Sequence, residues 1–244
     1  MVSCRRRAWK REVKREPDFD REFELSPERR IEARWRTCAK ARAWPVLLAH
    51  GAGAGHDLPL LAALERSLSA ARFEILSFHY PYMTRMRREG GRRPPDPMAV
   101  LEAAHERALS ELSLLTGGRR ALLVGKSMGG RVGSMIAAKG APARGLVLVG
   151  YPLHPAKHPE KERSEHFRAL AQPALFLSGT RDALCELPLL RRALRFYGGP
   201  ATLEVIEGAD HDFKRPGAGG RDPLAVADDL SRRIVAWVEA TWPD

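Results

Sequence analysis

From Trp44 to the end of the chain, short apolar runs alternate with amphipathic stretches. The runs read VLLA, FEILSF, ALLVG, GLVLV, ALFLSG and TLEVI. Continuous runs of Val, Leu and Ile are typical of strands buried on both faces, and intervening helices are typical of right-handed crossovers. The pattern therefore predicts an α/β fold, with a mostly parallel central sheet and helices on both of its faces.

The first part of the chain departs from this pattern. Residues 1–17 mix Arg, Lys and Glu with few apolar side chains, which predicts a basic, disordered tail. Beyond the tail, apolar and polar residues alternate on both sides of the turn signal SPE, and the apolar ones are Phe23, Leu25, Ile31, Ala33 and Trp35. A period of two on both sides of a turn predicts an N-terminal antiparallel hairpin. A chain of 244 residues suits one domain, which we expect over residues 18–244.

Charge and cysteine content narrow the function classes. The formal net charge is +11, but the excess lies in the first forty residues and in scattered arginines, without a reading helix, zinc finger or aromatic-basic stripe. We therefore expect no specific nucleic-acid partner. Three widely spaced cysteines, Cys4, Cys38 and Cys185, fit a reducing cytoplasm better than a disulfide framework. No apolar stretch approaches about 18 residues and no secretory signal is evident, so we expect a cytoplasmic protein without a membrane span.

The segment LLVGKSMGG, residues 122–130, allows two interpretations. A phosphate-binding loop of the form G-x-x-x-x-G-K-[ST] needs a glycine where this chain has Arg120. The second glycine-rich segment, HGAGAGHD, has His56 where a dinucleotide fingerprint needs its third glycine. Both nucleotide-binding interpretations fail at a specific residue, so we expect no nucleotide cofactor.

The other interpretation centres on Ser127. GKSMG matches the pattern G-x-S-x-G and lies between an apolar strand and a small-residue helix. A serine on such a strand-to-helix turn is held in strained backbone geometry with its Oγ exposed, and the following helix points its N-terminal dipole at the site. A turn of small residues that merely packs a helix on a sheet is the alternative.

Two further residues complete a candidate triad in the chain order serine, acid, histidine. Asp182 and His211 each follow a predicted strand, at the carboxyl edge where parallel sheets build their sites. His211 would act as general base toward Ser127, and Asp182 would orient its imidazole. Asp182 could instead serve as a turn or cap residue. The rival acids adjoin His211 in sequence and would need awkward loop geometry; they are Glu207, Asp210 and Asp212.

An oxyanion hole needs two backbone N–H donors, one after the nucleophile and one from the first strand-to-helix loop. Met128 would provide the first donor, and Ala52 in HGAGAG the second. Each such donor typically stabilises a transition state by roughly 3 kcal/mol. A flexible glycine turn is the alternative for the HGAGAG loop.

The surrounding segments bear on the substrate. The polar connection from Tyr151 to Pro173 has room for one short helix, so we expect little or no cap domain and an open site. Its histidines are expected at the surface; they are His154, His158 and His166. Lys126 either places a cation near bound substrate or faces solvent. The segment RMRREGGRRPPDP, residues 85–97, is expected to form a loop, either a basic rim or a solvated connection.

The chain resembles the α/β-hydrolase superfamily in LLAHGAGAG, GKSMGGRV, GLVLVGYPLHP, LFLSGTRDALCE and GADHDF, between Val46 and Phe213. Through YPLHP and DALCE it is similar, more narrowly, to the hydrolase-like group typified by testis-expressed protein thirty and the third subunit of the NSL histone-acetyltransferase complex. The resemblance implies an α/β-hydrolase fold, with Ser127, Asp182 and His211 at the triad positions.

Two functions remain in view. The leading hypothesis is a cytoplasmic serine hydrolase without metal or cofactor, which cleaves a carboxylic ester or related acyl bond of a small-molecule substrate through an acyl-enzyme. The alternative is a catalytically weak hydrolase-fold module whose role is protein interaction. The presence of all three triad residue types favours the enzyme. The oligomeric state does not follow from the sequence.

Overall fold

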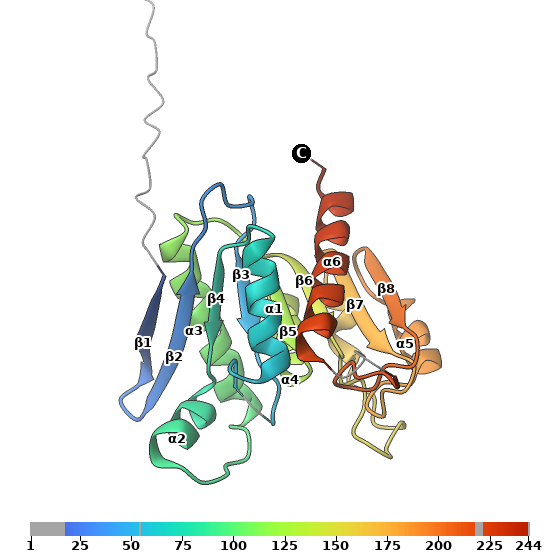
Figure 1. Ribbon diagram of the computed structural model, residues 1–244. Coiled ribbons are helices and arrows are strands. Elements are labelled where there is room, and N and C mark those ends of the chain that lie inside the picture. Colours follow the sequence, from blue (N-terminus) through green and yellow to red (C-terminus); the bar gives the residue numbers. More distant parts are fainter. Residues whose placement is uncertain (1–17, 54, 218–221, 244) are drawn as a thin grey trace, which may run out of the picture.

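The computed structural model describes residues 18–53, 55–217 and 222–243. Figure 1 shows one eight-stranded sheet in the order β1-β2-β4-β3-β5-β6-β7-β8. The strands are Phe19–Ser26 (β1), Arg29–Arg36 (β2), Val46–Ala49 (β3), Ile75–Phe78 (β4), Ala121–Lys126 (β5), Ala143–Val149 (β6), Ala174–Gly179 (β7) and Ala201–Ile206 (β8). Strands β3 to β8 pair in parallel, and β1 and β2 form an antiparallel hairpin beside β4. The predicted sheet and hairpin are confirmed, while the tail predicted for residues 1–17 lies outside the described residues.

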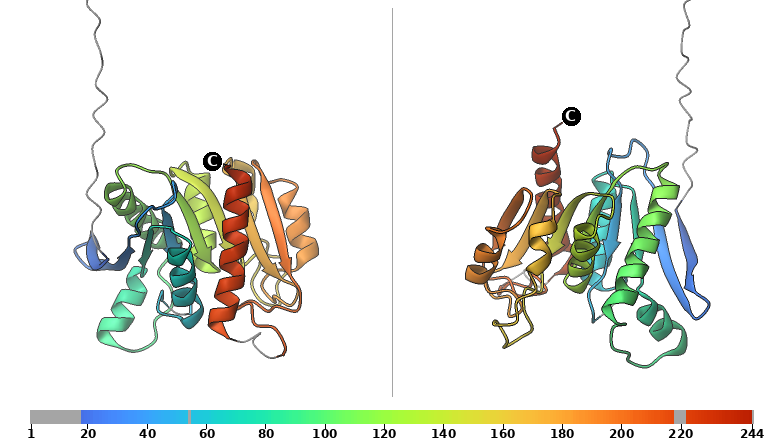
Figure 2. Two further views of the ribbon diagram at one scale, coloured as in Figure 1. Left: turned by 45° about the horizontal axis from the view of Figure 1, so that its top comes forward. Right: turned by 180° about the vertical axis from the view of Figure 1, so that it is seen from behind.

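Helices cover both faces of the sheet, as predicted. They are Pro59–Ala70 (α1), Pro81–Glu89 (α2), Met98–Leu115 (α3), Met128–Ala138 (α4), Leu187–Leu194 (α5) and Pro223–Thr241 (α6), with a short 3₁₀-helix, η1, at Glu165–Ala169. Figure 2 shows α1 and α6 on one face, with α3 and α4 on the other. None of the helices in the described ranges is both long and apolar enough to cross a membrane.

The strands read as unbroken apolar runs because each of them packs against two cores. In β3, Val46 and Leu48 belong to the core under α1 and α6, whereas Leu47 and Ala49 belong to the core under α3 and α4. All four side chains are fully buried. Successive residues of a strand point to opposite faces, so a strand between two helical layers needs apolar residues at every position.

Apolar and polar residues alternate along the hairpin because only one of its faces is buried. Its buried side chains extend the core beside α3; they are Phe23, Ile31, Ala33 and Trp35. The residues between them carry charge, and Arg34 of β2 donates to Asp20 of β1 across the pair at 3.1 Å. Charged side chains along the outer strand also discourage pairing with another chain.

The segment expected to be a loop over residues 85–97 is helical in its first part. Helix α2 begins at Pro81 and ends at Glu89, and Gly90 follows with φ +74°. Proline suits the first turn of a helix, and the two arginines in the last turn complement its dipole. The backbone N–H of Tyr82 also donates to Asp96 at 2.7 Å, which ties the helix start to the following loop. This short helix was not predicted because its first residues belong to the apolar segment HYPYM, which reads as a continuation of the preceding strand.

The strand order decides which loops meet. Strand β3 lies between β4 and β5, so the loop that follows β3 lies beside the turn that follows β5. The chain passes from one face of the sheet to the other between α1 and α3, and ligands bind at such switch points in open α/β sheets. The site is therefore expected at the carboxyl edge of β3, β5, β7 and β8.

Candidate active site

Ser127 occupies the turn between β5 and α4. Its backbone has φ +52° and ψ −116°, in a region that residues other than glycine rarely adopt. The turn is held by two hydrogen bonds, from the Ser127 N–H to Val149 O at 2.9 Å and from the Arg131 N–H to Ser127 O at 3.1 Å. Strain of this kind persists only where the surroundings hold it, and it is typical of functional sites.

Two glycines allow α4 to lie directly against the sheet below Ser127. A Cβ atom on Gly125 would lie 2.2 Å from the backbone N of Gly130, and one on Gly129 would lie 2.6 Å from Ala49 O. Backbone atoms cannot rotate away as side chains do. The glycines of GKSMGG are therefore required by close packing, whatever the role of the serine.

Replacing Gly125 by alanine should lower the free energy of unfolding by about 1–3 kcal/mol, as expected for overpacking at a tight contact. Urea unfolding followed by circular dichroism measures the change. Gly53→Ala is the matched control, because its Cβ would meet nothing within 4 Å. Equal stability of the two variants would contradict the packing role assigned to Gly125.

The structure brings Ser127, Asp182 and His211 into contact. The Nε2 atom of His211 lies 2.9 Å from Ser127 Oγ, and its Nδ1 atom lies 2.8 Å from Asp182 Oδ2. The Asp182 side chain is fully buried, and its second oxygen accepts the Leu184 N–H at 2.8 Å. An ionised carboxylate only accepts hydrogen bonds, so it selects the imidazole tautomer with a proton on Nδ1. The Nε2 lone pair then faces the serine hydroxyl.

The rival acids are engaged elsewhere. Asp210 Oδ1 accepts two backbone N–H groups of its own loop, each at 2.9 Å. Glu207 accepts from Thr180 Oγ1 at 3.3 Å. Asp212 pairs with Lys126 at 3.7 Å. Among the described residues, Asp182 is thus the carboxylate hydrogen-bonded to His211. Its other oxygen accepts the Leu184 N–H, so Asp182 also has the turn role that was the alternative interpretation of this residue.

The two expected oxyanion-hole residues lie on neighbouring segments. Met128 begins α4 directly after Ser127. The loop of Ala52 passes beside the serine, because a Cβ on Gly51 would lie 3.5 Å from Ser127 Cβ. Tyr82 of α2 donates from its hydroxyl to the carbonyl of Ala52 at 3.0 Å and to that of Gly51 at 3.3 Å. In a planar trans peptide the N–H points opposite to the C=O of the preceding residue, so the contact of Tyr82 with the Gly51 carbonyl helps set the direction of the Ala52 N–H.

Lys126 does not face solvent, which corrects one of the two expectations for this residue. Only 5% of its surface is exposed, and its Nζ lies 3.7 Å from Asp212 Oδ1. Burial lowers the pKa of Lys126. Burial alone would raise the pKa of Asp212, but Lys126 and Lys214 shift it below its ordinary value. An ion pair between the buried Lys126 and the half-exposed Asp212 therefore joins the residue before the serine to the residue after the histidine.

The surface position expected for His154 is wrong. Its side chain is buried, and its Nε2 accepts the Glu186 N–H at 3.2 Å. His166 is half-buried, with Nε2 2.8 Å from Ser134 Oγ, while His158 is exposed as expected. The polar connection folds back onto the domain around the fully buried Phe167, so polarity along the chain did not indicate exposure.

Two contacts of this region were not predicted from the sequence. Tyr82 reaches the Ala52 loop from an unpredicted helix 30 residues further along the chain. Close to it, the rings of His56 and His79 stack with centroids 3.7 Å apart. Burial, above all, lowers the pKa of His56 to about 2 and that of His79 to about 4. Both contacts form because β3 and β4 are adjacent strands of the sheet.

Comparisons with known proteins agree with this architecture. Residues 42–239 match a family model described as an alpha/beta hydrolase domain. A carboxyl esterase from Bacillus coagulans superimposes with a TM-score of 0.73 at 12% identity, over 92% of this chain and 99% of that one. An alpha-beta serine hydrolase homologue from Coxiella burnetii gives 0.69 at 15% identity, over 90% and 98%. Dienelactone hydrolase from Anabaena variabilis gives 0.66 at 20% identity, over 89% and 97%. At these identities the likeness concerns the fold.

Proposed function

Because the chain belongs to the alpha/beta hydrolase domain family, we propose that it is a serine hydrolase with Ser127, His211 and Asp182 as its catalytic triad. The observation that carries the proposal is the continuous contact Asp182 Oδ2–His211 Nδ1 and His211 Nε2–Ser127 Oγ, at 2.8 and 2.9 Å. The base is within hydrogen-bond reach of both the nucleophile and the orienting acid, which is the geometric requirement for nucleophilic catalysis.

The proposed reaction has two steps. Ser127 Oγ attacks the acyl carbonyl while its proton passes to His211 Nε2, and Asp182 stabilises the resulting imidazolium. The backbone N–H groups of Ala52 and Met128 stabilise the oxyanion. When the tetrahedral intermediate collapses, the leaving alcohol or amine takes the proton from His211 and the acyl group stays on Ser127. Water then attacks the acyl-enzyme with His211 again as base, which releases the acid.

We propose a carboxylic ester or related acyl bond of a small molecule as the substrate. The connection between β6 and β7 contains one short 3₁₀-helix, so a site at this edge lacks the insertion that would enclose a long acyl chain. The carboxyl esterase and the dienelactone hydrolase among the similar structures are named for acyl–oxygen chemistry, which supports this choice. We further propose a cytoplasmic location, and membership of the narrower group that YPLHP and DALCE indicate.

A fluorophosphonate probe tests the proposal directly, because it labels serines whose hydroxyl is activated by a base. We expect labelling of the wild-type protein and none of Ser127→Ala. Ser134→Ala is a matched control, since Ser134 Oγ also contacts a histidine, His166, at 2.8 Å. Its proton is directed to Arg131 O at 2.8 Å, so we expect labelling to be unchanged. A folded wild-type protein that takes up no label would favour the protein-interaction module instead.

Tyr82→Phe should lower kcat by roughly threefold to tenfold with little change in KM. The hydroxyl donates to the carbonyls of Gly51 and Ala52 and so orients the peptide groups on both sides of Ala52, and a hydrogen bond of this kind contributes about 0.5–1.5 kcal/mol. Steady-state kinetics on a short acyl ester measures the change. Tyr197→Phe is the control, because Tyr197 also donates to a carbonyl, that of Gln172 at 2.8 Å, away from this loop. If Tyr82→Phe and the wild type have equal kcat, Tyr82 does not help to position the oxyanion hole.

A further inference from the structure

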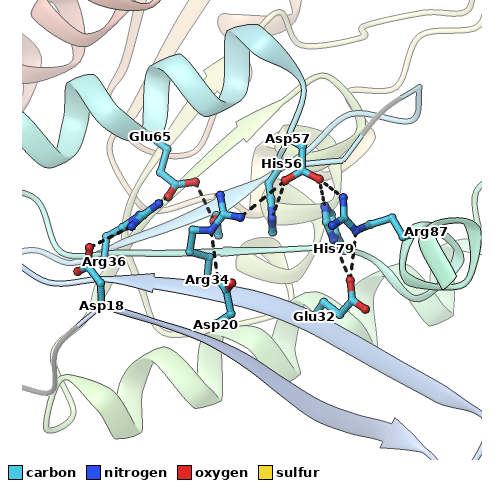
Figure 3. A network of polar contacts seen from close by, with 11 residues as sticks. Asp18, Asp20, Glu32, Arg34, Arg36, His56, Asp57, Glu65, His79 and Arg87 are labelled. Atoms are coloured by element: carbon cyan, nitrogen blue, oxygen red, sulfur yellow. Dashed lines mark hydrogen bonds and ion pairs between the residues drawn. The ribbon is translucent and has the colours of Figure 1, made fainter.

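A second cluster of chemically competent side chains lies beside the Ala52 loop. His56 and Asp57 come from the loop between β3 and α1, His79 directly follows β4, and Glu32 lies on β2 (Figure 3). One candidate ligand atom from each of His56, Asp57 and His79 lies within 4.8 Å of the others. These residues play no part in the proposed hydrolysis.

Three of the four imidazole nitrogens of His56 and His79 are buried without hydrogen bonds. Only 1% of His79 and 4% of His56 is exposed. Both ring nitrogens of His79, and Nδ1 of His56, have no hydrogen-bond partner among the residues that the structure describes. A buried polar atom is normally hydrogen-bonded, because leaving it unpaired costs free energy. Three such atoms in one place indicate a partner of another kind.

We propose that His56, Asp57 and His79 form a binding site for a divalent transition-metal ion of the Zn²⁺ class. Two imidazoles and one carboxylate suit Zn²⁺, which in its open sites takes three protein ligands and a water molecule. The proposal is independent of the serine hydrolase chemistry, because no triad residue belongs to the site.

The positions of the ligand atoms favour this assignment. Asp57 Oδ1 lies 3.1 Å from His56 Nε2, and Asp57 Oδ2 lies 3.9 Å from His79 Nε2. The Nε2 atom of His79 faces the loop, since a Cβ on Gly55 would lie 2.3 Å from it. The other nitrogen, Nδ1, lies 3.6 Å from Glu32 Oε2. A carboxylate behind the second nitrogen is the usual outer partner of a metal-ligating histidine.

Binding requires a small rearrangement for which there is space. Zn²⁺ ligands at about 2.0–2.2 Å in a tetrahedral arrangement are about 3.3 Å apart, so the widest pair must approach. The rings of His56 and His79 are stacked at 17°, and one ring must rotate about its Cβ–Cγ bond so that the ion lies in both ring planes. A pocket of about 380 Å³, lined by Glu32, His56, His79 and Arg87 among others, leads to the cluster from the surface.

The charges around the site have opposing effects. Asp57 and Glu32 both form ion pairs with Arg87 of α2, and Asp57 also lies 4.0 Å from Arg34. Figure 3 shows the Arg87 guanidinium between these two carboxylates. The Arg87 side chain is nearly half exposed and can move into solvent. Arg87 is therefore the nearer of the two cations, Arg87 and Arg34, that compete with an ion for Asp57.

Isothermal titration calorimetry of the full chain with Zn²⁺, after dialysis against a chelator, tests the site. We expect one ion per chain for the wild type. His79→Phe, which keeps an aromatic ring in the stack, should weaken binding by at least about 100-fold, because losing a ligand exceeds the about 10–100-fold effect of losing an outer partner. His158→Phe, at an exposed histidine, should leave affinity unchanged. Arg87→Gln should tighten binding, because it removes the competing cation.

Three results would overturn the site. They are no Zn²⁺ binding by the wild type, wild-type affinity in His79→Phe, and a Co²⁺ spectrum with the charge-transfer absorption of thiolate ligands, which would place the ion at cysteines. Circular dichroism of each variant without metal checks the fold. If His79→Phe does not fold, Asp57→Asn replaces it, because this exposed loop residue keeps its shape and loses only the anionic ligand. Wild-type affinity in Asp57→Asn would overturn the site equally.

Discussion

Replacing Ser127 by alanine should lower kcat for a short acyl ester by on the order of 10⁶-fold, the size of effect expected when a triad nucleophile is lost. Alanine removes the Oγ atom that lies 2.9 Å from His211 Nε2 and leaves no group to form the acyl-enzyme. A residual rate above that of water is expected from the oxyanion-hole donors and from substrate binding. Steady-state kinetics, with ester hydrolysis followed by absorbance, measures the change.

Ser134→Ala is the matched control for this experiment as well. It removes a serine of α4 whose Oγ lies 2.8 Å from another histidine, His166. We expect less than a twofold change in kcat, because the Ser134 hydroxyl donates to Arg131 O and His166 belongs to no triad. Unfolding of each variant, followed by circular dichroism, separates lost chemistry from lost structure. Appreciable turnover by folded Ser127→Ala would assign the reaction to another group.

Replacing Asp182 by asparagine should lower kcat by about 10⁴-fold, as the loss of a triad acid does when the histidine adopts the wrong tautomer. The carboxylate accepts from His211 Nδ1 at 2.8 Å, whereas the asparagine NH₂ group can donate to that nitrogen instead. The proton would then lie on Nε2, so this nitrogen could no longer accept the proton of the Ser127 hydroxyl. Asparagine has nearly the same shape, and its oxygen can still accept the Leu184 N–H. The expected loss is therefore in kcat and not in folding.

Asp210→Asn controls for the removal of a carboxylate near His211. Asparagine retains an oxygen for the two backbone N–H groups that Asp210 accepts, so the loop keeps its shape. We expect kcat within a few-fold of the wild type. A near-normal rate for Asp182→Asn, or a large loss for Asp210→Asn alone, would contradict the assignment of Asp182 as the orienting acid.

Local periodicity was sufficient for most of the architecture. The apolar spacing of MAVLEAAHERALSELSLL indicates a helix, and α3 covers that segment, Met98–Leu115. Alternation around SPE predicted the hairpin of β1 and β2, and unbroken apolar runs predicted strands covered on both faces. Each of these signals depends on which faces of an element are buried, and that information is carried by neighbouring residues of the same segment.

The convergence of Ser127, Asp182 and His211 was also predicted from the sequence, because each lies at or shortly after the end of a predicted strand. Parallel strands end at the same edge of a sheet, so residues at their carboxyl ends converge without knowledge of further contacts. The sequence left several acids open for His211. Only the structure distinguished Asp182, whose Oδ2 lies 2.8 Å from His211 Nδ1, from the acids that are hydrogen-bonded elsewhere.

The tertiary structure alone decided which polar residues are buried and what they touch. Lys126 is buried at the end of an apolar strand, His154 is buried in a segment that reads as polar, and Tyr82 reaches the Ala52 loop from an unpredicted helix. The cluster of His56, Asp57 and His79 assembles because β3 lies beside β4, which itself pairs with β2. These contacts join residues far apart in the chain and depend on strand order. A local pattern shows which face of a strand is buried, but it does not show which strand lies beside it.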